Sequence, residues 1–210
     1  MKQSLKILAG ALGGIVIFVA FGLVFILSGF YNVAALQEHT PLLAWTFETL
    51  SDRSIERHAG ELPAPLPTDS AQLLHGFEHY RAMCETCHGG PGVDRGEIGE
   101  GLYPRPPRLV RAAAGMSDAE LFWVVKNGIK ATGMPGFGST HDDASLLQIV
   151  AVVRSLPDMS EEEYADRAAA VATAGIDTHE SPLDSVAGEG PGASASHTHA
   201  PGTPPHTHAH

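Results

Sequence analysis

The chain has 210 residues, a formal net charge of −11 and two cysteines. Its acidity and the lack of a basic stripe argue against a nucleic-acid-binding protein. Only one stretch, at the N-terminus, is apolar for long enough to cross a bilayer, which excludes a polytopic membrane protein. We therefore expect one anchor and one small domain.

The anchor is the uncharged stretch Ile7–Leu27, whose 21 residues span about 30 Å at about 1.5 Å per helical residue. Lys2 and Lys6 precede it, and Glu38 is the next charge. This asymmetry predicts a single-pass helix in a bacterial inner membrane, with the remainder in the periplasm. The alternative is a signal peptide cleaved near Val33-Ala34-Ala35, but the apolar stretch is long for a signal core.

A second helix is predicted after the anchor, because Thr40 can cap it and Pro41 suits its first position. Its apolar positions up to Gly60 are Leu42, Leu43, Phe47, Leu50 and Ile55. We consider two roles for this helix: a stalk lying on membrane lipid, with Trp45 near the headgroups, and a helix that docks a partner. The alternating prolines of residues 62–67 then predict an extended spacer.

The segment Cys84-Glu85-Thr86-Cys87-His88 has the residue types and spacing for covalent attachment of haem c: two thiols for the vinyl groups and an imidazole for the iron. A thioredoxin-like redox pair would need a strand-to-helix turn, whereas the flanking residues here have helical patterns. A zinc site would need further close ligands, and none follows His88 before His141. We therefore predict one haem.

Three helices are expected around this segment. Asp69 caps the first, which runs to about Met83, and Gly76 within it would let another helix cross closely. Ser117 and Glu120 form a capping box for the second, which ends at Gly128. The third covers residues 143–155, with the buried positions Leu146, Leu147, Ile149, Val150 and Val153.

The iron bound by His88 needs a ligand on its other face. Met134 lies in an irregular Gly- and Pro-containing loop that can bring a thioether to iron, whereas Met116 precedes a capping box and is expected to pack in the core. His75 and His79 are too close in sequence to the attachment segment to reach the opposite face. His141 is the one plausible substitute. We predict Met134 as the second ligand.

Three motifs together carry a family resemblance: GxxxYxxxCxxCHG from Gly76 to Gly89, the proline-rich residues 103–107, and Asn127-Gly-Ile-Lys-Ala-Thr-Gly-Met-Pro135. The chain resembles class I cytochromes c over about residues 69–157, and in particular the monohaem domains grouped with the cytochrome c subunits of cbb-type haem-copper oxidases. The resemblance implies an all-α class I cytochrome c fold, in which three core helices surround one haem.

The resemblance also implies roles for single residues. His88 would be the proximal ligand, Met134 the distal ligand, and the carbonyl of Pro104, Pro106 or Pro107 would contact the proximal imidazole. The chain differs from the family at Ala151-Val152-Val153, where an aromatic residue commonly packs near the position of Gly76. It also has one CxxCH motif, whereas the two-haem oxidase subunits have two.

These features predict an electron carrier rather than an enzyme, acting alone or as a subunit of an oxidoreductase complex, with redox proteins of a respiratory chain as partners. Arg105, Arg108 and Arg111 either pair with haem propionates or form a solvated basic face. The alternatives are a gas sensor or haem enzyme with an open iron site, and a protein that handles metal.

The metal-handling alternative rests on the C-terminal tail. Ser160 and Glu163 begin a short helix, and from Gly175 the composition predicts disorder. The tail histidines that could bind a divalent metal weakly are His197, His199, His206, His208 and His210. The expected organisation is an anchor (1–30), a membrane-proximal helix and Pro-rich linker (31–67), a cytochrome c domain (68–158), a short helix (159–174) and the tail (175–210).

Overall fold

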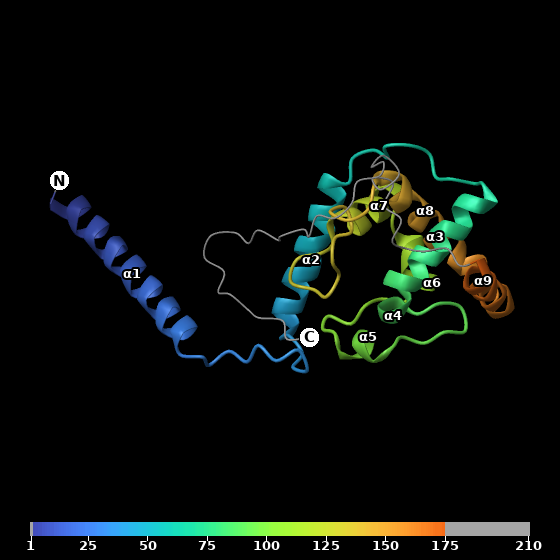
Figure 1. The fold of residues 1–210 in the computed structure, drawn as a ribbon. Helices are drawn as coiled ribbons and strands as arrows, with labels where there is room; N and C mark the ends of the chain where they lie inside the picture. Colours follow the sequence, from blue (N-terminus) through green and yellow to red (C-terminus); the bar gives the residue numbers. More distant parts are fainter. Residues whose placement is uncertain (1, 175–210) are drawn as a thin grey trace, which may run out of the picture. The chain divides into compact units, whose positions relative to one another are not determined.

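The computed structural model describes residues 2–174 (Figure 1). Within this range the regular structure is helical and contains no strand. The elements are α1 (Lys2–Leu27), α2 (Pro41–His58), α3 (Ser70–Met83), α4 (Glu85–His88), α5 (Glu97–Gly101), α6 (Leu109–Ala112), α7 (Asp118–Asn127), α8 (Asp143–Ser155) and α9 (Glu161–Ala174), with short 3-10 helices at Ala113–Gly115 and Leu156–Asp158. The predicted all-α class I cytochrome c fold is thereby confirmed.

Helix α1 is the predicted apolar stretch. Its segment Lys6–Leu27 is 22 residues long and apolar enough to cross a membrane, a test that a signal sequence also passes. None of that segment is buried against the rest of the described chain. Its length and composition are those of a candidate membrane anchor.

The three predicted core helices appear as α3, α7 and α8, and α3 and α7 begin at their predicted caps. The carboxylate of Asp69 accepts hydrogen bonds from the backbone N–H groups of Ala71 and Gln72, at 3.0 and 3.1 Å. Ser117 and Glu120 form the predicted capping box at the start of α7. The side chain of Asp142 accepts from the N–H of Ser145 at 2.8 Å at the start of α8.

Helices α3 and α8 cross at Gly76, as predicted. A Cβ atom at this position would collide with the backbone carbonyl of Gln148, so the absence of a side chain allows the two backbones to touch. Around the crossing, Phe77, Tyr80 and Ile149 are fully buried. Buried apolar surface on α3, α7 and α8 thus makes one core, which positions the attachment segment that follows α3.

Helix α9 is part of this core. Its Tyr164 is 1% exposed, and the ring packs edge-on against Phe77 of α3 with the centroids 4.9 Å apart. Val171, seven residues further along α9, is also buried. The close crossing at Gly76 is retained although α8 has no aromatic residue at Ala151-Val152-Val153, and Tyr164 of α9 contributes an aromatic contact to the same core. Figure 1 shows α3, α8 and α9 side by side.

Helix α2 begins at Pro41, as predicted, although Thr40 makes no side-chain capping bond. It contacts α7, and its Ile55 is buried. The linker that follows has no regular structure, and its Leu62 and Leu66 pack against the core. Helix α2 and the linker therefore contact the rest of their own chain, an arrangement that neither of the roles considered for this segment requires.

Candidate haem site

The attachment segment forms the single helical turn α4, directly after α3. Cys84 ends α3, and its carbonyl accepts the N–H groups of Cys87 and His88, at 3.1 and 2.9 Å. Because the two cysteines are separated by one tight turn, their thiols are held at a fixed spacing at the end of a core helix. Cys84 and His88 are buried, and Cys87 is half-buried.

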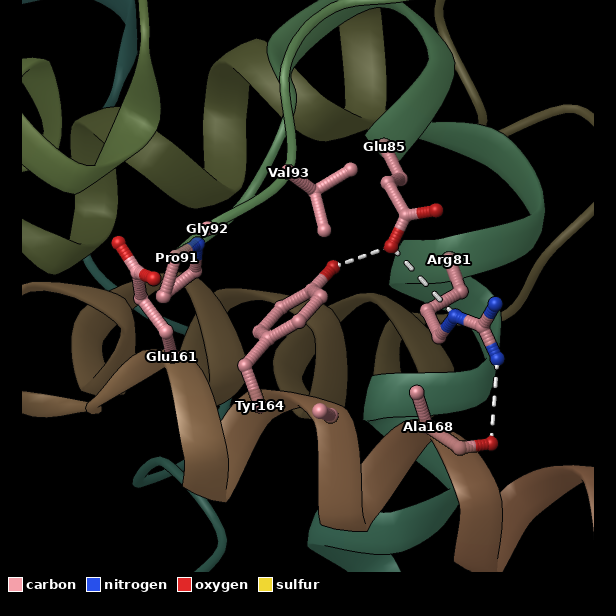
Figure 2. A pocket seen from close by; sticks show the side chains of 9 residues that line it. Arg81, Glu85, Pro91, Gly92, Val93, Glu161, Tyr164 and Ala168 are labelled. Carbon is pink, nitrogen blue, oxygen red and sulfur yellow. Dashed lines mark hydrogen bonds and ion pairs between the residues drawn. The ribbon is translucent and has the colours of Figure 1, made fainter.

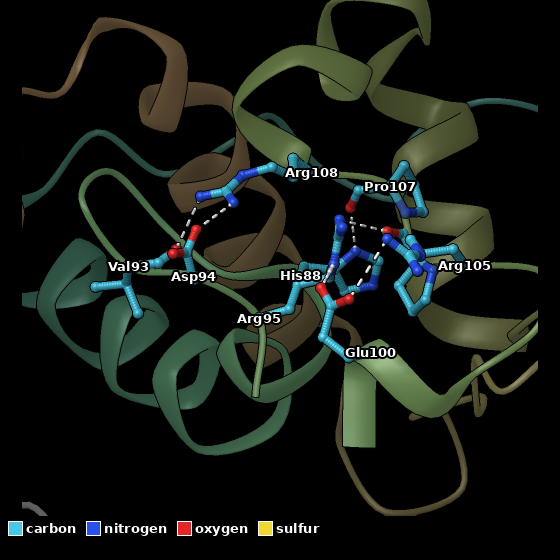
Figure 3. Close-up of polar contacts among 9 residues, drawn as sticks. His88, Val93, Asp94, Arg95, Glu100, Arg105, Pro107 and Arg108 are labelled. Atoms are coloured by element: carbon cyan, nitrogen blue, oxygen red, sulfur yellow. Dashed lines mark hydrogen bonds and ion pairs between the residues drawn. The ribbon is translucent and has the colours of Figure 1, made fainter. Parts of the chain in front are cut away.

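The imidazole of His88 is oriented by a single backbone contact. Its Nδ1 lies 2.7 Å from the carbonyl oxygen of Pro107, so Nδ1 donates and carries the proton (Figure 3). Burial lowers the pKa of His88, and the charge of Arg95 lowers it further, while the Pro107 hydrogen bond opposes both. The ring is thus neutral, with Nε2 as a free electron-pair donor. Of the three prolines left open by the sequence, Pro107 supplies the carbonyl.

The protonation of Cys84 bears on the competing interpretations of the motif. Burial, followed by the neighbouring Cys87, raises the pKa of the Cys84 thiol to about 12. A redox-active CxxC pair needs a lowered thiol pKa. Within residues 2–174, no cluster of three or more His, Cys, Asp or Glu side chains could hold a metal ion. The raised pKa opposes the thioredoxin-like alternative, and the lack of a ligand cluster in this range opposes the zinc alternative.

Tyr80 fixes the chain after the motif. Its hydroxyl donates to the carbonyl oxygen of Gly89 at 2.6 Å. Burial raises the pKa of Tyr80, so the phenol stays protonated and acts as a donor. Tyr80 is the tyrosine of the GxxxYxxxCxxCHG motif, and the structure shows that its hydroxyl is bonded to the residue next to His88.

Two arginines brace the proline-rich loop behind His88. Arg95 donates to the carbonyl of Pro106 at 3.1 Å and pairs with Glu100 at 3.0 Å. Arg108 pairs with Asp94 at 2.7 Å and donates to the carbonyl of Val93 at 3.0 Å. Figure 3 shows Arg95 with Glu100 beside His88, and Arg108 with Asp94. They hold the carbonyl that orients His88.

The three arginines that the sequence grouped together, Arg105, Arg108 and Arg111, have different surroundings in the structure. Arg108 is occupied by Asp94, and Arg105 is largely exposed with Glu100 at 3.4 Å. Arg111 is exposed. Arg95, the other arginine that braces the loop, was not predicted, because one arginine in a loop before the proline motif has no distinguishing pattern.

Met134 lies in a compact loop between α7 and α8 and is half-buried. Its N–H donates to the Thr132 hydroxyl at 3.0 Å, and its carbonyl accepts the N–H of Ile129 at 3.2 Å. Gly128 has a φ of 68°, and a Cβ there would come within 2.6 Å of the Met134 carbonyl oxygen, so this turn requires glycine. The position of Met134 is thus set by its own loop.

The Met134 loop contacts the segment that leads into the proline motif. A Cβ at Gly133 would lie 2.5 Å from the side chain of Leu102. Leu102 in turn follows α5, which packs on Cys87 through Gly99. The loop of Met134 and the segment of His88 are therefore linked by direct packing through α5 and Leu102.

The other sulfur and imidazole candidates have different surroundings. Met116 packs against the core, as predicted. The ring of His141 lies edge-on to that of His79 on α3, with the centroids 5.2 Å apart, and its Nδ1 is 2.9 Å from the Thr140 hydroxyl oxygen. His141 is therefore engaged with α3. The tail histidines 197, 199, 206, 208 and 210 lie outside the described residues.

An open cavity of about 430 Å³ lies between α9 and the attachment segment (Figure 2). Two of its charged groups are already paired: Glu85 accepts from the Tyr164 hydroxyl at 2.5 Å and lies 3.4 Å from Nε of Arg81. Arg81 also donates to the carbonyl of Ala168 at 3.2 Å. These contacts connect α4 to α3 and α9 at the edge of the cavity.

The residues present fit a covalently held haem. The thiols of Cys84 and Cys87 are one turn apart, and His88 offers a neutral Nε2 whose opposite nitrogen is fixed. The donor set of two thiols, one oriented imidazole and one loop thioether matches the chemistry of a c-type haem iron.

One of three comparisons with known proteins, the family match, agrees with this assignment. Residues 71–152 match the family described as cytochrome c oxidase, cbb3-type, subunit III. No curated protein matches the chain. Among solved structures, a chain of the reducing HAO-like protein complex of Kuenenia stuttgartiensis is similar, with 22% identity and a TM-score of 0.40 over 46% of this chain. The match spans about half of that chain, 48% of its length.

Proposed function

Because residues 71–152 match the family described as cytochrome c oxidase, cbb3-type, subunit III, we propose that this chain is a membrane-tethered monohaem c-type cytochrome. It carries single electrons between redox protein partners of a respiratory chain, either alone or as a subunit of an oxidoreductase complex. Cys84 and Cys87 hold one haem c, and His88 ligates its iron. The observation that carries this proposal is the His88 ring, fixed through Nδ1 by the Pro107 carbonyl at 2.7 Å.

When bound, a haem c supplies one reversible electron at its iron. The chain's residues then have three tasks. His88 presents a neutral Nε2, Met134 presents a thioether from its compact loop, and the core of α3, α7 and α8 keeps water out. A thioether favours ferrous iron relative to a second imidazole, so Met134 would raise the reduction potential. The contacts of His141 with His79 and Thr140 support Met134 as the second ligand.

The proposed location is the bacterial inner membrane, with the haem domain on the periplasmic side. Two features support it: α1 has the length and composition of a membrane span, and Lys2 and Lys6 precede its apolar part. Membrane lipid would then contact α1. The alternative functions have less support, because metal handling rests on tail histidines outside the described residues and a sensor requires that Met134 leave the iron open.

Covalent attachment tests the proposal directly. The chain would be produced in a host that attaches haem to exported proteins, denatured and weighed by mass spectrometry. The parent and a Thr86→Ala control, changed at an exposed residue between the cysteines, should each keep the mass of one haem. The double variant Cys84→Ala/Cys87→Ala should lose it. A parent without covalent haem would overturn the proposal.

A further inference from the structure

Helix α2 and His39, two residues before its start, contact the rest of the chain at two points. At the N-terminal point, the N–H of His39 donates to the Tyr103 hydroxyl at 3.2 Å, and the two rings meet edge-on at 5.0 Å. At the C-terminal point, the ring of His58 stacks on Trp123 of α7 at 6.2 Å, and Ile55 is buried. The helix therefore bridges the proline-rich loop and α7.

Between these two points, the face of α2 that turns toward the rest of the chain is apolar and only partly covered. Leu43, Phe47 and Ile55 are spaced four and eight residues apart and share one stripe of the helix. The ring of Phe47 lies 5.5 Å from that of His39, which contacts Tyr103, so Phe47 is on the inner side. Phe47 is nevertheless 42% exposed, and Leu50, three residues further on, is 64% exposed.

An apolar stripe that is fixed at both ends and uncovered in the middle needs an apolar occupant. The two residues that hold the ends of the stripe, Tyr103 and Trp123, indicate which occupant this is. Tyr103 precedes the loop whose Pro107 carbonyl orients His88, and Trp123 lies on the helix that leads into the Met134 loop. The stripe thus spans the interval between the segments that carry the two proposed axial ligands, which is where a haem held by them would present an edge.

We propose that α2, with His39, forms an additional wall of the haem site, in which Phe47 contacts the haem. This inference rests on the proposed function. It assigns a cofactor-binding role to residues outside the family match, which begins at residue 71. The wall excludes water from that edge of the haem and so favours the less charged ferrous state. Because α2 follows the candidate anchor, the same helix that shields the haem connects it to the membrane.

The test compares the inner and outer sides of the same helix in the full-length haem protein. Trp45 is two residues from Phe47, about 200° around the helix, and is 62% exposed. A carboxylate next to the haem stabilises ferric iron, so Phe47→Glu should lower the reduction potential, measured by redox titration. Trp45→Glu introduces the same charge on the outer side and should leave the potential near that of the parent.

If the Phe47→Glu protein does not form with haem bound, a pair of alanine variants at the same two positions provides the test. Phe47→Ala should accelerate reduction of the haem by ascorbate several-fold and alter the Soret circular dichroism, whereas Trp45→Ala should change neither. Equal potentials in the two Glu variants, together with parental rates and dichroism in Phe47→Ala, would overturn the inference. A parent without a c-type spectrum would instead refute the proposed function, so the two failures are distinguishable.

Discussion

The hydroxyl of Tyr164 donates a hydrogen bond of 2.5 Å to the carboxylate of Glu85, 79 residues earlier and between the two cysteines of the attachment motif. The Tyr164 ring also packs so closely on Gly90 that a Cβ there would lie 2.5 Å from it. Burial and the bond to Glu85 raise the pKa of Tyr164, so the phenol remains a donor. Through these two contacts, helix α9 holds the attachment turn α4 in place (Figure 2).

Tyr164→Phe removes the hydroxyl and keeps the ring contact with Phe77. Since a hydrogen bond to a charged group contributes about 1.5–3 kcal/mol, we expect the free energy of unfolding to fall by about 2 kcal/mol. Urea unfolding of the haem protein measures this change. Tyr31→Phe, at an exposed tyrosine, serves as the control. A Tyr164→Phe protein as stable as the parent would contradict the role given to this bond.

The crossing of α3 and α8 predicts a second effect. Gly76→Ala places a methyl group against the Gln148 backbone, which cannot move without separating the two helices. Overpacking of this kind costs about 1–3 kcal/mol, and we expect a matching loss of unfolding free energy. Gly115→Ala adds the same methyl group where nothing lies within 4 Å and should be close to neutral. Equal stabilities of the two variants would show that the helices do not touch at Gly76.

The cap of α8 predicts a pH-dependent contribution to stability. The backbone N–H of Ser145, followed by its side chain, lowers the pKa of the Asp142 carboxyl. A lowered folded-state pKa means that the stabilisation is fully present above the unfolded value of about 3.9 and disappears as the pH falls through the folded value.

Asp142→Ala should therefore lower the unfolding free energy by about 1 kcal/mol at neutral pH. The difference from the parent should shrink as the pH is taken down to about 3. Urea unfolding at both pH values measures it, with the exposed Asp166→Ala as the control. A difference that is unchanged at low pH would rule out the carboxylate cap as its source.

The anchor proposal predicts how the chain is retained in membranes. A charged residue at the centre of a span costs about 2.5–3.5 kcal/mol, so Val16→Arg should increase the fraction of chain released by an alkaline carbonate wash. Val33→Arg, beyond α1, should be retained like the parent. The intact mass of the purified chain shows at the same time whether α1 persists. A parent that lacks α1 would establish a cleaved signal peptide instead.

Short-range patterns predicted much of the fold and the site. Caps at Asp69 and Ser117 placed the starts of α3 and α7, and Gly76 predicted the helix crossing, because each depends on local geometry or on a close approach that only glycine permits. The CxxCH spacing predicted the attachment turn for the same reason. Attachment itself and ligation by His88 and Met134 remain proposals.

Contacts between distant parts of the chain were not predictable. Nothing near Arg95 indicates that it braces Pro106, and nothing near Tyr164 indicates that it reaches Glu85. The choice of Pro107 among three prolines depends on how the loop closes over His88. The apolar pattern of α2 was noted, but a pattern does not identify its partner, so the contact with α7 appears only in the folded chain.

The most direct test of the central claim is the optical spectrum of the membrane-extracted protein, oxidised and reduced, with carbon monoxide added to the reduced form. With His88 and Met134 as axial ligands, the spectrum should be low-spin and c-type, and carbon monoxide should leave it unchanged. Met134→Ala should bind carbon monoxide, while the Met116→Ala control, at a core methionine, should not. Carbon monoxide binding by the parent protein would contradict the account and favour a sensor or enzyme with an open iron site.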